Sequence, residues 1–309
     1  MRIGREAVMR CAVGVTKPVA DSCGRGLVAR ALPIAIALSV AACSGDNGGG
    51  VPFFFVHLSD PQLGMYMGDS SFAQETANLE LAVATANRLH PSFVIVTGDL
   101  VNQVGNKREI DEYRRVMSRL DDDITLYNVP GNHDVGNVPT RATIDAWRKR
   151  FGPDHYSFTA GDLTGIVLNS SLIAAPDEAR DLYDAQEKWL IGELERARRD
   201  GAWEVVIFQH HPWYLDTADE PDSYSNIPRV RRGKYLALFR KYGVRTVLAG
   251  HDHRYTIARD TTFHMIANGS VGKPRDGGKS GLAVVSVGPN GIGHRYFDFG
   301  ELPNRIAVH

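Results

Sequence analysis

Five short polar segments, far apart in the chain, constrain its fold more than any other feature. Each follows a run of β-branched and aromatic residues, which predicts that each begins where a buried strand ends. Ligand sites form at the carboxyl edge of an open α/β sheet, where parallel strands end together. The segments are Asp60-Pro61-Gln62, Gly98-Asp99-Leu100-Val101-Asn102, Gly131-Asn132-His133-Asp134, His210-His211-Pro212 and Gly250-His251-Asp252-His253.

The side chains in these segments are oxygen and imidazole donors. Asp60 and Gln62 lie two positions apart after a predicted strand, so we expect both side chains on one side, within reach of one metal ion. His251 and His253 have the same spacing. Carboxylate, amide oxygen and imidazole together suit two divalent transition metals, whereas a structural zinc site commonly uses thiolates. The segments therefore predict a dinuclear metal site.

The pattern between the segments predicts an α/β fold. Strands alternate with helices and are followed by antiparallel strands near the C-terminus, which predicts a four-layer αββα sandwich of two mixed sheets flanked by helices, in a single domain. The predicted strands are 53–58, 93–97, 124–129, 165–169, 205–209, 245–249, 263–267, 282–287 and 296–299, and the predicted helices are 71–89, 109–120, 144–151, 185–199 and 235–242.

The first fifty residues have a different composition. Residues 1–30 are basic, and the apolar run 31–42 is too short to span a bilayer comfortably, as in a signal peptide. The run ends at Val40-Ala41-Ala42-Cys43, which resembles a bacterial lipoprotein cleavage box. We expect residues 1–42 to be a lipoprotein signal peptide, Cys43 to be lipidated, residues 43–50 to be a flexible tether and residues 51–309 to be the folded domain.

This reading predicts an exported, membrane-anchored lipoprotein that faces the periplasm or the cell surface, at the outer membrane in a Gram-negative host. The alternative is a start codon placed too far upstream of an ordinary secretory signal, with Met9 as another possible start. Either alternative predicts export.

Cysteine content and charge limit the other possibilities. Cys11 and Cys23 lie in the segment to be removed, so Cys43 would be the one cysteine of the mature chain and no disulfide could form within it. The mature chain would carry 29 basic and 34 acidic residues, a net charge of −5. That balance gives no support for nucleic acid as a stable partner. A basic cluster at 229–234 is explained by one exposed helical turn.

The order and spacing of the five segments, between Phe55 and Asn268, resemble the calcineurin-like metallophosphoesterase superfamily. The resemblance implies two divalent metal ions, with Mn, Fe, Zn and Co as candidates. His210 matches the family ligand better than His211, because that ligand lies two residues before the proline. By the same resemblance, the first metal is held by Asp60, Gln62 and His253, the second by Asn132, His210 and His251, and both by the bridging Asp99.

The resemblance also implies a reaction. A metal-activated hydroxide would attack the phosphorus of a phosphate ester in line. His133 matches the family histidine that contacts the phosphate and can protonate the leaving oxygen, and Asp134 or Asn102 could orient its ring. Arg254 could contact the phosphate or face the solvent.

Two positions depart from the usual family pattern. Gln62 stands where the family usually has histidine. This Asp-Pro-Gln variant is similar to a branch of the family that acts on phosphoproteins. A glutamine at this position also occurs in manganese-dependent ADP-ribose pyrophosphatases. Asn102 and Gln103 stand where the serine/threonine phosphoprotein phosphatases have aspartate and arginine. The missing arginine removes one phosphate clamp, so membership of that narrower class is not expected.

Two alternatives to a phosphate-ester hydrolase acting on phosphorylated substrates stay open. One is a nucleotide pyrophosphatase or cyclic-nucleotide phosphodiesterase, for which Trp213, Tyr214 or Tyr224 could stack a base or could simply pack a loop. The other is a non-catalytic metal-binding lipoprotein that has lost one metal through Gln62.

Overall fold

Two mixed sheets form the centre of the structure, a computed structural model that describes residues 51–259 and 262–307. The first sheet has the strand order β11-β10-β1-β2-β3, with β1, β2 and β3 parallel and β10 antiparallel to both of its neighbours. Its strands are β1 (Phe53–Leu58), β2 (Phe93–Thr97), β3 (Thr125–Val129), β10 (Gly281–Gly288) and β11 (Gly291–Asp298).

The second sheet has the strand order β4-β5-β6-β7-β9-β8. Four adjacent strands are parallel, and the two outer strands, β4 and β8, are antiparallel to their neighbours. Its strands are β4 (Tyr156–Ala160), β5 (Leu163–Val167), β6 (Glu204–Phe208), β7 (Thr246–Ala249), β8 (Thr256–Arg259) and β9 (His264–Ala267).

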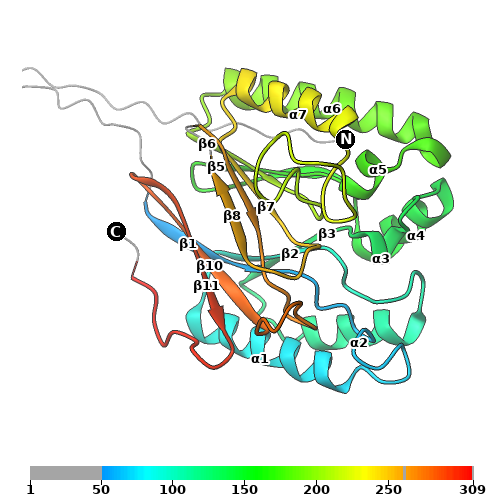
Figure 1. Cartoon of the computed structure of the whole chain (residues 1–309). Coiled ribbons are helices and arrows are strands. Elements are labelled where there is room, and N and C mark those ends of the chain that lie inside the picture. The colour runs from blue at the N-terminus through cyan, green and yellow to red at the C-terminus, as the bar shows by residue number, and fades with distance from the viewer. Residues whose placement is uncertain (1–50, 260–261, 308–309) are drawn as a thin grey trace, which may run out of the picture. The chain divides into compact units, whose positions relative to one another are not determined.

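Helices cover the outer face of each sheet (Figure 1). The helices α1 (Ala73–Leu89) and α2 (Lys107–Met117) pack on the first sheet, and α6 (Arg180–Arg199) and α7 (Arg229–Tyr242) pack on the second. Shorter elements connect them: α3 (Asn132–Val135), α4 (Arg141–Phe151), α5 (Ser170–Ala174) and the 3₁₀ turn η1 (Asp177–Ala179). The predicted four-layer αββα sandwich in a single domain is therefore confirmed.

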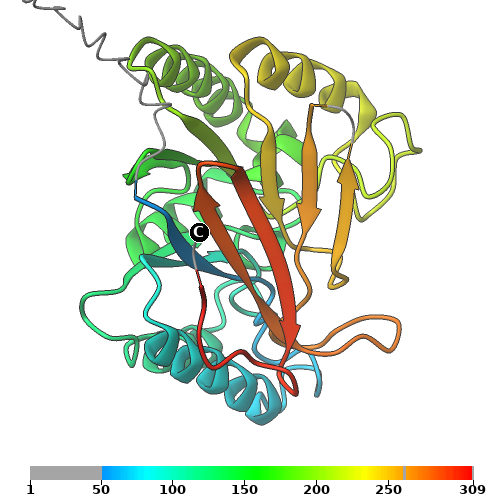
Figure 2. The same ribbon diagram turned by 90° about the vertical axis from the view of Figure 1, so that its left-hand side faces the viewer.

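The inner core lies between the two sheets. Phe55 and Phe93 of the first sheet stack at 4.4 Å between ring centroids, and Phe208 of the second sheet meets Phe55 edge-on. All five residues of β2 and of β6 are buried, which explains why each strand contains an unbroken run of four apolar residues. Figure 2 shows the two sheets side by side, with a helical layer outside each.

Some predicted elements differ from the observed ones. The strands β4 and β8 were not predicted, because these edge strands lack a continuous apolar run. The strand β9 runs parallel to β7, although the strands of this region were expected to be antiparallel. The predicted solvent-exposed basic cluster was wrong for Arg232, which is buried and donates to the carbonyls of Ile227 and Glu220.

The N-terminal predictions concern residues outside those described. The signal peptide, Cys43 and the tether all fall within residues 1–50. Among the described residues, no helix combines the length and the apolar character needed to cross a membrane.

Candidate metal centre

The five polar segments lie at the carboxyl ends of strands from both sheets. β1, β2 and β3 of the first sheet lead into the segments at Asp60, Asp99 and Asn132, and β6 and β7 of the second lead into those at His210 and His251. Contacts join the two sheets here: the backbone N–H of His251 donates to Oδ2 of Asp60 at 3.0 Å, across 191 residues of sequence.

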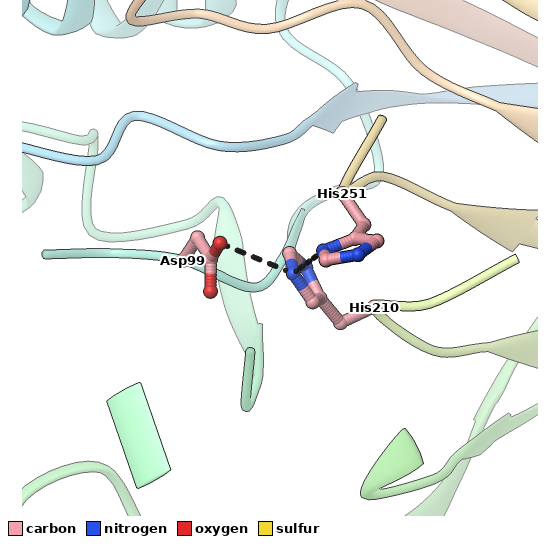
Figure 3. A group of neighbouring side chains, drawn as sticks. All are labelled: Asp99, His210 and His251. Atoms are coloured by element: carbon pink, nitrogen blue, oxygen red, sulfur yellow. Dashed lines mark hydrogen bonds and ion pairs between the residues drawn. The ribbon is translucent and has the colours of Figure 1, made fainter. Parts of the chain in front are cut away.

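Two groups of possible metal ligands share Asp99. One contains Asp99, His210 and His251, and the other contains Asp60, Asp99 and His253. Within each group the ligand atoms lie within 4.8 Å of one another, and every side chain is buried. Figure 3 shows the first group, with His210 between the carboxylate of Asp99 and the ring of His251. A carboxylate common to both groups has the position that a bridging ligand requires.

Each of the three histidines has one ring nitrogen tied to a backbone carbonyl. Nδ1 of His210 lies 2.8 Å from the carbonyl oxygen of Thr97, Nε2 of His251 lies 2.7 Å from that of Tyr224, and Nδ1 of His253 lies 2.6 Å from that of Lys273. A carbonyl can only accept, so each of these nitrogens carries a proton. The other nitrogen of each neutral ring therefore presents a lone pair to the cluster, as metal-binding histidines do.

The converging atoms are mostly acceptors. Nε2 of His210 lies 3.0 Å from Oδ1 of Asn132, 3.1 Å from Nδ1 of His251 and 3.2 Å from Oδ2 of Asp99. Two ligand atoms bound about 2.1 Å from one cation lie roughly 3.0–3.4 Å apart when the ligand–metal–ligand angle is between the octahedral and the tetrahedral value. The donor set and its spacing therefore fit a divalent cation.

The pKa values of the clustered side chains also favour a positive charge among them. Burial alone would lower the pKa of His210, but Asp99, together with Asp60 and the carbonyl of Thr97, raises that pKa to about 9. Burial, reinforced by His210, lowers the pKa of His251 to about 4. Burial opposes ionisation of Asp99, yet its histidine neighbours hold the pKa of Asp99 below the ordinary value. Burial also opposes the charge on His253, but Asp60 raises the pKa of that ring above its ordinary value. The carboxylates of the cluster thus favour positive charge beside them, which a cation would also supply.

The amide of Gln62 is oriented by its neighbours. The carboxylate of Asp69 can only accept, so Nδ2 of Asn102 faces it at 2.6 Å, and Oδ1 of Asn102 then accepts from Nε2 of Gln62 at 3.1 Å. Oε1 of Gln62 is left buried with no hydrogen-bond partner. A buried amide oxygen without a partner is uncommon, and this oxygen fits the role of a metal ligand.

Asn132 is oriented in a similar way. Its Nδ2 donates to Oδ1 of Asn137 at 2.9 Å and to the hydroxyl of Tyr224 at 3.0 Å. Oδ1 of Asn132 therefore faces His210 and the cluster. In both amide residues of the predicted ligand set the nitrogen is thus engaged by the protein, which leaves the amide oxygen available as a ligand.

The backbone at the strand ends is left-handed. Asp60, Gln62, Asp99, His251 and His253 have φ of 50°, 38°, 50°, 70° and 59°. Residues with side chains rarely adopt this conformation, and such backbone strain collects at functional sites. The expectation that Asp60 and Gln62 share one side of an extended strand was wrong, because β1 ends at Leu58 and both residues lie in the turn beyond it.

Glycines allow the strand ends to approach closely. A Cβ on Gly131 would overlap the carboxylate and backbone N of Asp99, and a Cβ on Gly250 would overlap Oγ of Ser59 and the carboxylate of Asp60. These two glycines are needed for space, and neither has a positive φ.

His133 lies beside the cluster. Its backbone N–H donates to Oδ1 of Asp99 at 2.8 Å, and its Nδ1 donates to the backbone carbonyl of Asn102 at 2.6 Å. This leaves Nε2 for a substrate. Asp134 and Asn102 were the two residues predicted to orient this ring, and the ring contacts Asn102.

The structure gives Asp134 a different position from the predicted one. Its Oδ1 accepts from the backbone N–H of Leu100 at 3.0 Å, and its Oδ2 accepts from that of Gly131 at 2.8 Å. With both oxygens bound to backbone, Asp134 joins two loops of the site and does not hold the His133 ring. Burial, and then Asp99, raise its pKa well above the ordinary value.

Other candidates are also placed. His211 is in neither group and its Nδ1 lies 3.0 Å from Oγ of Ser170. Arg254 is paired with Asp252 and Asp276. Trp213 and Tyr214 are 0% and 3% exposed and pack in the core outside the second sheet, so they pack the protein and do not stack a ligand.

Tyr224 was one of three aromatic candidates in the sequence, and only the structure distinguishes it. Its side chain is 59% exposed, its ring lies 4.8 Å from that of His251, and its hydroxyl contacts Asn132. The roles of Asp69 and Ser59 at the site were not predicted, since isolated polar residues in loops carry no signal of their own.

A fold of two mixed sheets with a shared-carboxylate cluster at the strand ends defines a dinuclear metallohydrolase. A calcineurin-like phosphoesterase family profile matches residues 55–255, and the chain belongs to that family. It is a phosphoric ester hydrolase whose site holds divalent metal ions.

The relatives agree. The chain is 33% identical over 269 residues to the serine/threonine-protein phosphatase CPPED1 of Rattus norvegicus, covering 82% of this chain and 86% of the relative. It is 32% identical over 270 residues to the human protein of that name, with the same coverage. The fold is similar to that of a dimetal phosphatase from Danio rerio, with a TM-score of 0.59 and 16% identity over 80% of this chain and 99% of that one.

Proposed function

We propose that this protein is a dinuclear metal phosphatase that removes phosphate from phosphoserine or phosphothreonine in proteins. The first metal would be held by Asp60, Gln62 and His253, the second by Asn132, His210 and His251, and Asp99 would bridge them. The observation that carries the proposal is the shared position of Asp99 in two buried ligand groups. The substrate class is supported by the CPPED1 relatives, which are named serine/threonine-protein phosphatases.

When bound, two divalent cations supply Lewis acidity to the ester oxygens and lower the pKa of water toward neutrality. The chain's own residues do the rest. The Nδ1–H of His133 is held by the carbonyl of Asn102, so a proton on Nε2 is available only in the imidazolium form. That proton can pass to the leaving oxygen of the ester, which is general acid catalysis.

The exposed residues around the cluster favour a phosphate monoester over a nucleotide. Trp213 and Tyr214 are buried, which leaves Tyr224 as the one member of the predicted aromatic set with a free ring face at the site. A single exposed tyrosine offers no pair of rings between which a base could stack. Its hydroxyl, held by Asn132, can instead donate to a phosphate oxygen.

The missing arginine after Asn102 bears on this proposal. Arg254, the other arginine candidate, is already paired with two aspartates. The side chain of Arg275 is 45% exposed, and its Nη1 lies 3.5 Å from Oδ1 of Asp252. Its charge lowers the pKa of Tyr224, against the larger effect of burial, which raises that pKa. We propose that Arg275 and Tyr224 contact the substrate phosphate.

Initial rates on a substrate panel test the function. The Mn²⁺-loaded protein should hydrolyse phosphoserine and phosphothreonine peptides with a higher kcat/KM than ADP-ribose or a cyclic nucleotide. Arg275→Met should lower kcat/KM on the peptides, whereas Arg259→Met, at an exposed position of β8, should not. A preference for ADP-ribose would favour the pyrophosphatase alternative. Absence of hydrolysis of every substrate, with two metals bound, would favour a non-catalytic binding protein.

We also propose that the mature protein is attached to a membrane by lipid on Cys43 and exported by residues 1–42. The support is the apolar run that ends in Val40-Ala41-Ala42-Cys43 before a glycine-rich segment. A glycine-rich segment of this kind is a flexible tether, which would separate the folded residues from the bilayer surface.

A further inference from the structure

A histidine interrupts the apolar strand β1. His57 is completely buried and lies on the face of β1 toward the second sheet, because Phe55, two positions earlier, belongs to the core between the sheets. An imidazole in an apolar layer costs free energy unless its nitrogens have partners. Nδ1 of His57 lies 3.3 Å from Nε2 of His294, and Nε2 lies 2.8 Å from Oγ1 of Thr97.

These contacts are part of a longer chain that ends on the carboxylate of Asp60. Oγ1 of Thr97 donates to Oγ of Ser59 at 2.9 Å, and Ser59 donates to Oδ2 of Asp60 at 2.5 Å. At the other end, Nδ1 of His294 lies 3.2 Å from the hydroxyl of Tyr255, a residue 36% exposed. From solvent to site, the chain consists of Tyr255, His294, His57, Thr97, Ser59 and Asp60, of which the last four are buried.

The direction of every bond follows from the carboxylate end. An ionised Asp60 only accepts, so the single proton of Ser59 is used there and its oxygen must accept from Thr97. The proton of Thr97 is then used as well, so Thr97 accepts from Nε2–H of His57. A neutral His57 with its proton on Nε2 must accept at Nδ1 from Nε2–H of His294. Each donor thus points toward the metal site.

Both histidines in the chain are neutral. Burial, and then His294, lower the pKa of His57 well below the ordinary value. Burial lowers the pKa of His294 to about 3. Neutral rings can each donate once and accept once, as the one-directional chain requires.

The chain restricts the rotation of the Asp60 carboxylate. Oδ2 accepts from Ser59 and, at 3.0 Å, from the backbone N–H of His251, which also lies 3.2 Å from Oδ1. Oδ1 in addition lies 3.4 Å from Nε2 of His253. Gly250 packs against this pair so closely that any Cβ would overlap both Ser59 and Asp60. Oδ2 is thus held by two protein donors, and Oδ1 faces His253 within the group of Asp60, Asp99 and His253.

We propose that His57, Thr97 and Ser59 are positioning residues for the first metal: they form a buried, one-directional hydrogen-bond chain that holds Oδ1 of Asp60 toward the cation. The inference rests on the proposed function in one respect, the assignment of Asp60 to the first metal. Outer partners of metal ligands typically contribute about 10–100-fold to metal affinity.

Calorimetric titration of the chelator-stripped protein with Mn²⁺ tests the chain. Thr97→Val keeps the shape of the side chain and removes its hydroxyl, and should weaken the first site about tenfold while leaving the second unchanged. Thr97→Ser restores the hydroxyl and should restore the affinity. Thr246→Val, at a buried strand threonine of the other sheet, is the matched control and should bind as wild type does.

Asp60→Ala separates the two proposals. If that variant still binds two Mn²⁺ ions as wild type does, the assignment of Asp60 is wrong and the proposed function loses its first site. If Asp60→Ala loses one site but Thr97→Val titrates like wild type, the positioning chain alone is wrong. Equal weakening of both sites in Thr97→Val and Thr97→Ser would indicate a general structural role and would also overturn it.

A second measurement needs no variant. Two-bond ¹H–¹⁵N correlation spectra of the Zn²⁺-loaded wild type report the tautomer of each histidine. His57 is expected to carry its proton on Nε2 and none on Nδ1. The opposite tautomer would reverse the donors of the chain and overturn the proposal.

Discussion

Nε2 of His210 lies 3.1 Å from Nδ1 of His251, although each ring has already given a proton to a backbone carbonyl. In their neutral forms the two facing nitrogens are both acceptors and would repel each other. Only a positive charge between or on them stabilises this arrangement, either the proton that Asp99 holds on His210 or a cation.

Asp99 and His133 should separate metal binding from catalysis. Asp99→Ala removes the carboxylate common to both ligand groups, so it should reduce both metal content and turnover. His133→Ala should lower kcat by about 10²–10⁴-fold with metal content retained, because its ring contacts a backbone carbonyl and belongs to neither group. Elemental analysis beside steady-state kinetics makes the distinction. Loss of a full metal equivalent in His133→Ala would require the two roles to be exchanged.

Gln62 should make the first site the weaker one. An amide oxygen is a poorer donor than imidazole for these ions, so wild type should hold one Mn²⁺ tightly and need added metal to fill the other. Gln62→His should raise first-site occupancy at limiting Mn²⁺. Gln103→His, one residue beyond Asn102 and exposed, is the control for an added histidine. Two equally tight sites in wild type, unchanged by Gln62→His, would refute the prediction.

Glu109 should make stability depend on pH. Burial raises its pKa to about 7; the backbone N–H groups of Gln103 and Asn102 oppose the rise, and nearby Asp69 adds to it. A carboxyl whose folded-state pKa lies above its ordinary value of 4.5 stabilises the fold at low pH, and that contribution is lost as pH rises through about 7. Wild type should therefore lose thermal stability relative to Glu109→Gln between about pH 5 and pH 8.

Thermal unfolding of both proteins in chelator, which removes the pH dependence of metal binding, provides the measurement for Glu109. Glu178→Gln, at an exposed position, controls for the loss of one carboxylate. A stability difference that is the same at both pH values would mean that Glu109 does not titrate in this range.

Cys43 should determine the cellular location. Full-length protein expressed in a Gram-negative host should fractionate with membranes, and Cys43→Ser should lose labelling by a clickable fatty acid. A chain that starts at Val51 should be recovered without membranes and with the same kcat/KM. Labelling that persists in Cys43→Ser would refute the lipid anchor, whereas export without any labelling would favour the ordinary secretory signal.

The sequence alone determined the scaffold and the chemistry at the strand ends. β1 and β2 were predicted with their observed bounds, because each begins with an apolar run of four residues bounded by polar or turn residues. The starts of α6 and α7 were placed too late, since their first turns are polar and lack apolar periodicity. The donors after each strand could be identified because a sheet edge gathers polar residues that a core would exclude.

Tertiary structure decided where those donors point. No sequence pattern reveals that Asp60 and Gln62 adopt left-handed backbone, that Asp69 acting through Asn102 turns the oxygen of Gln62 inward, or that Asp134 binds backbone instead of His133. Nor does it reveal that His57 is connected to Asp60 through residues of two strands. Strand ends are set by local apolar patterns, but hydrogen-bond direction depends on partners that only folding brings within 3 Å.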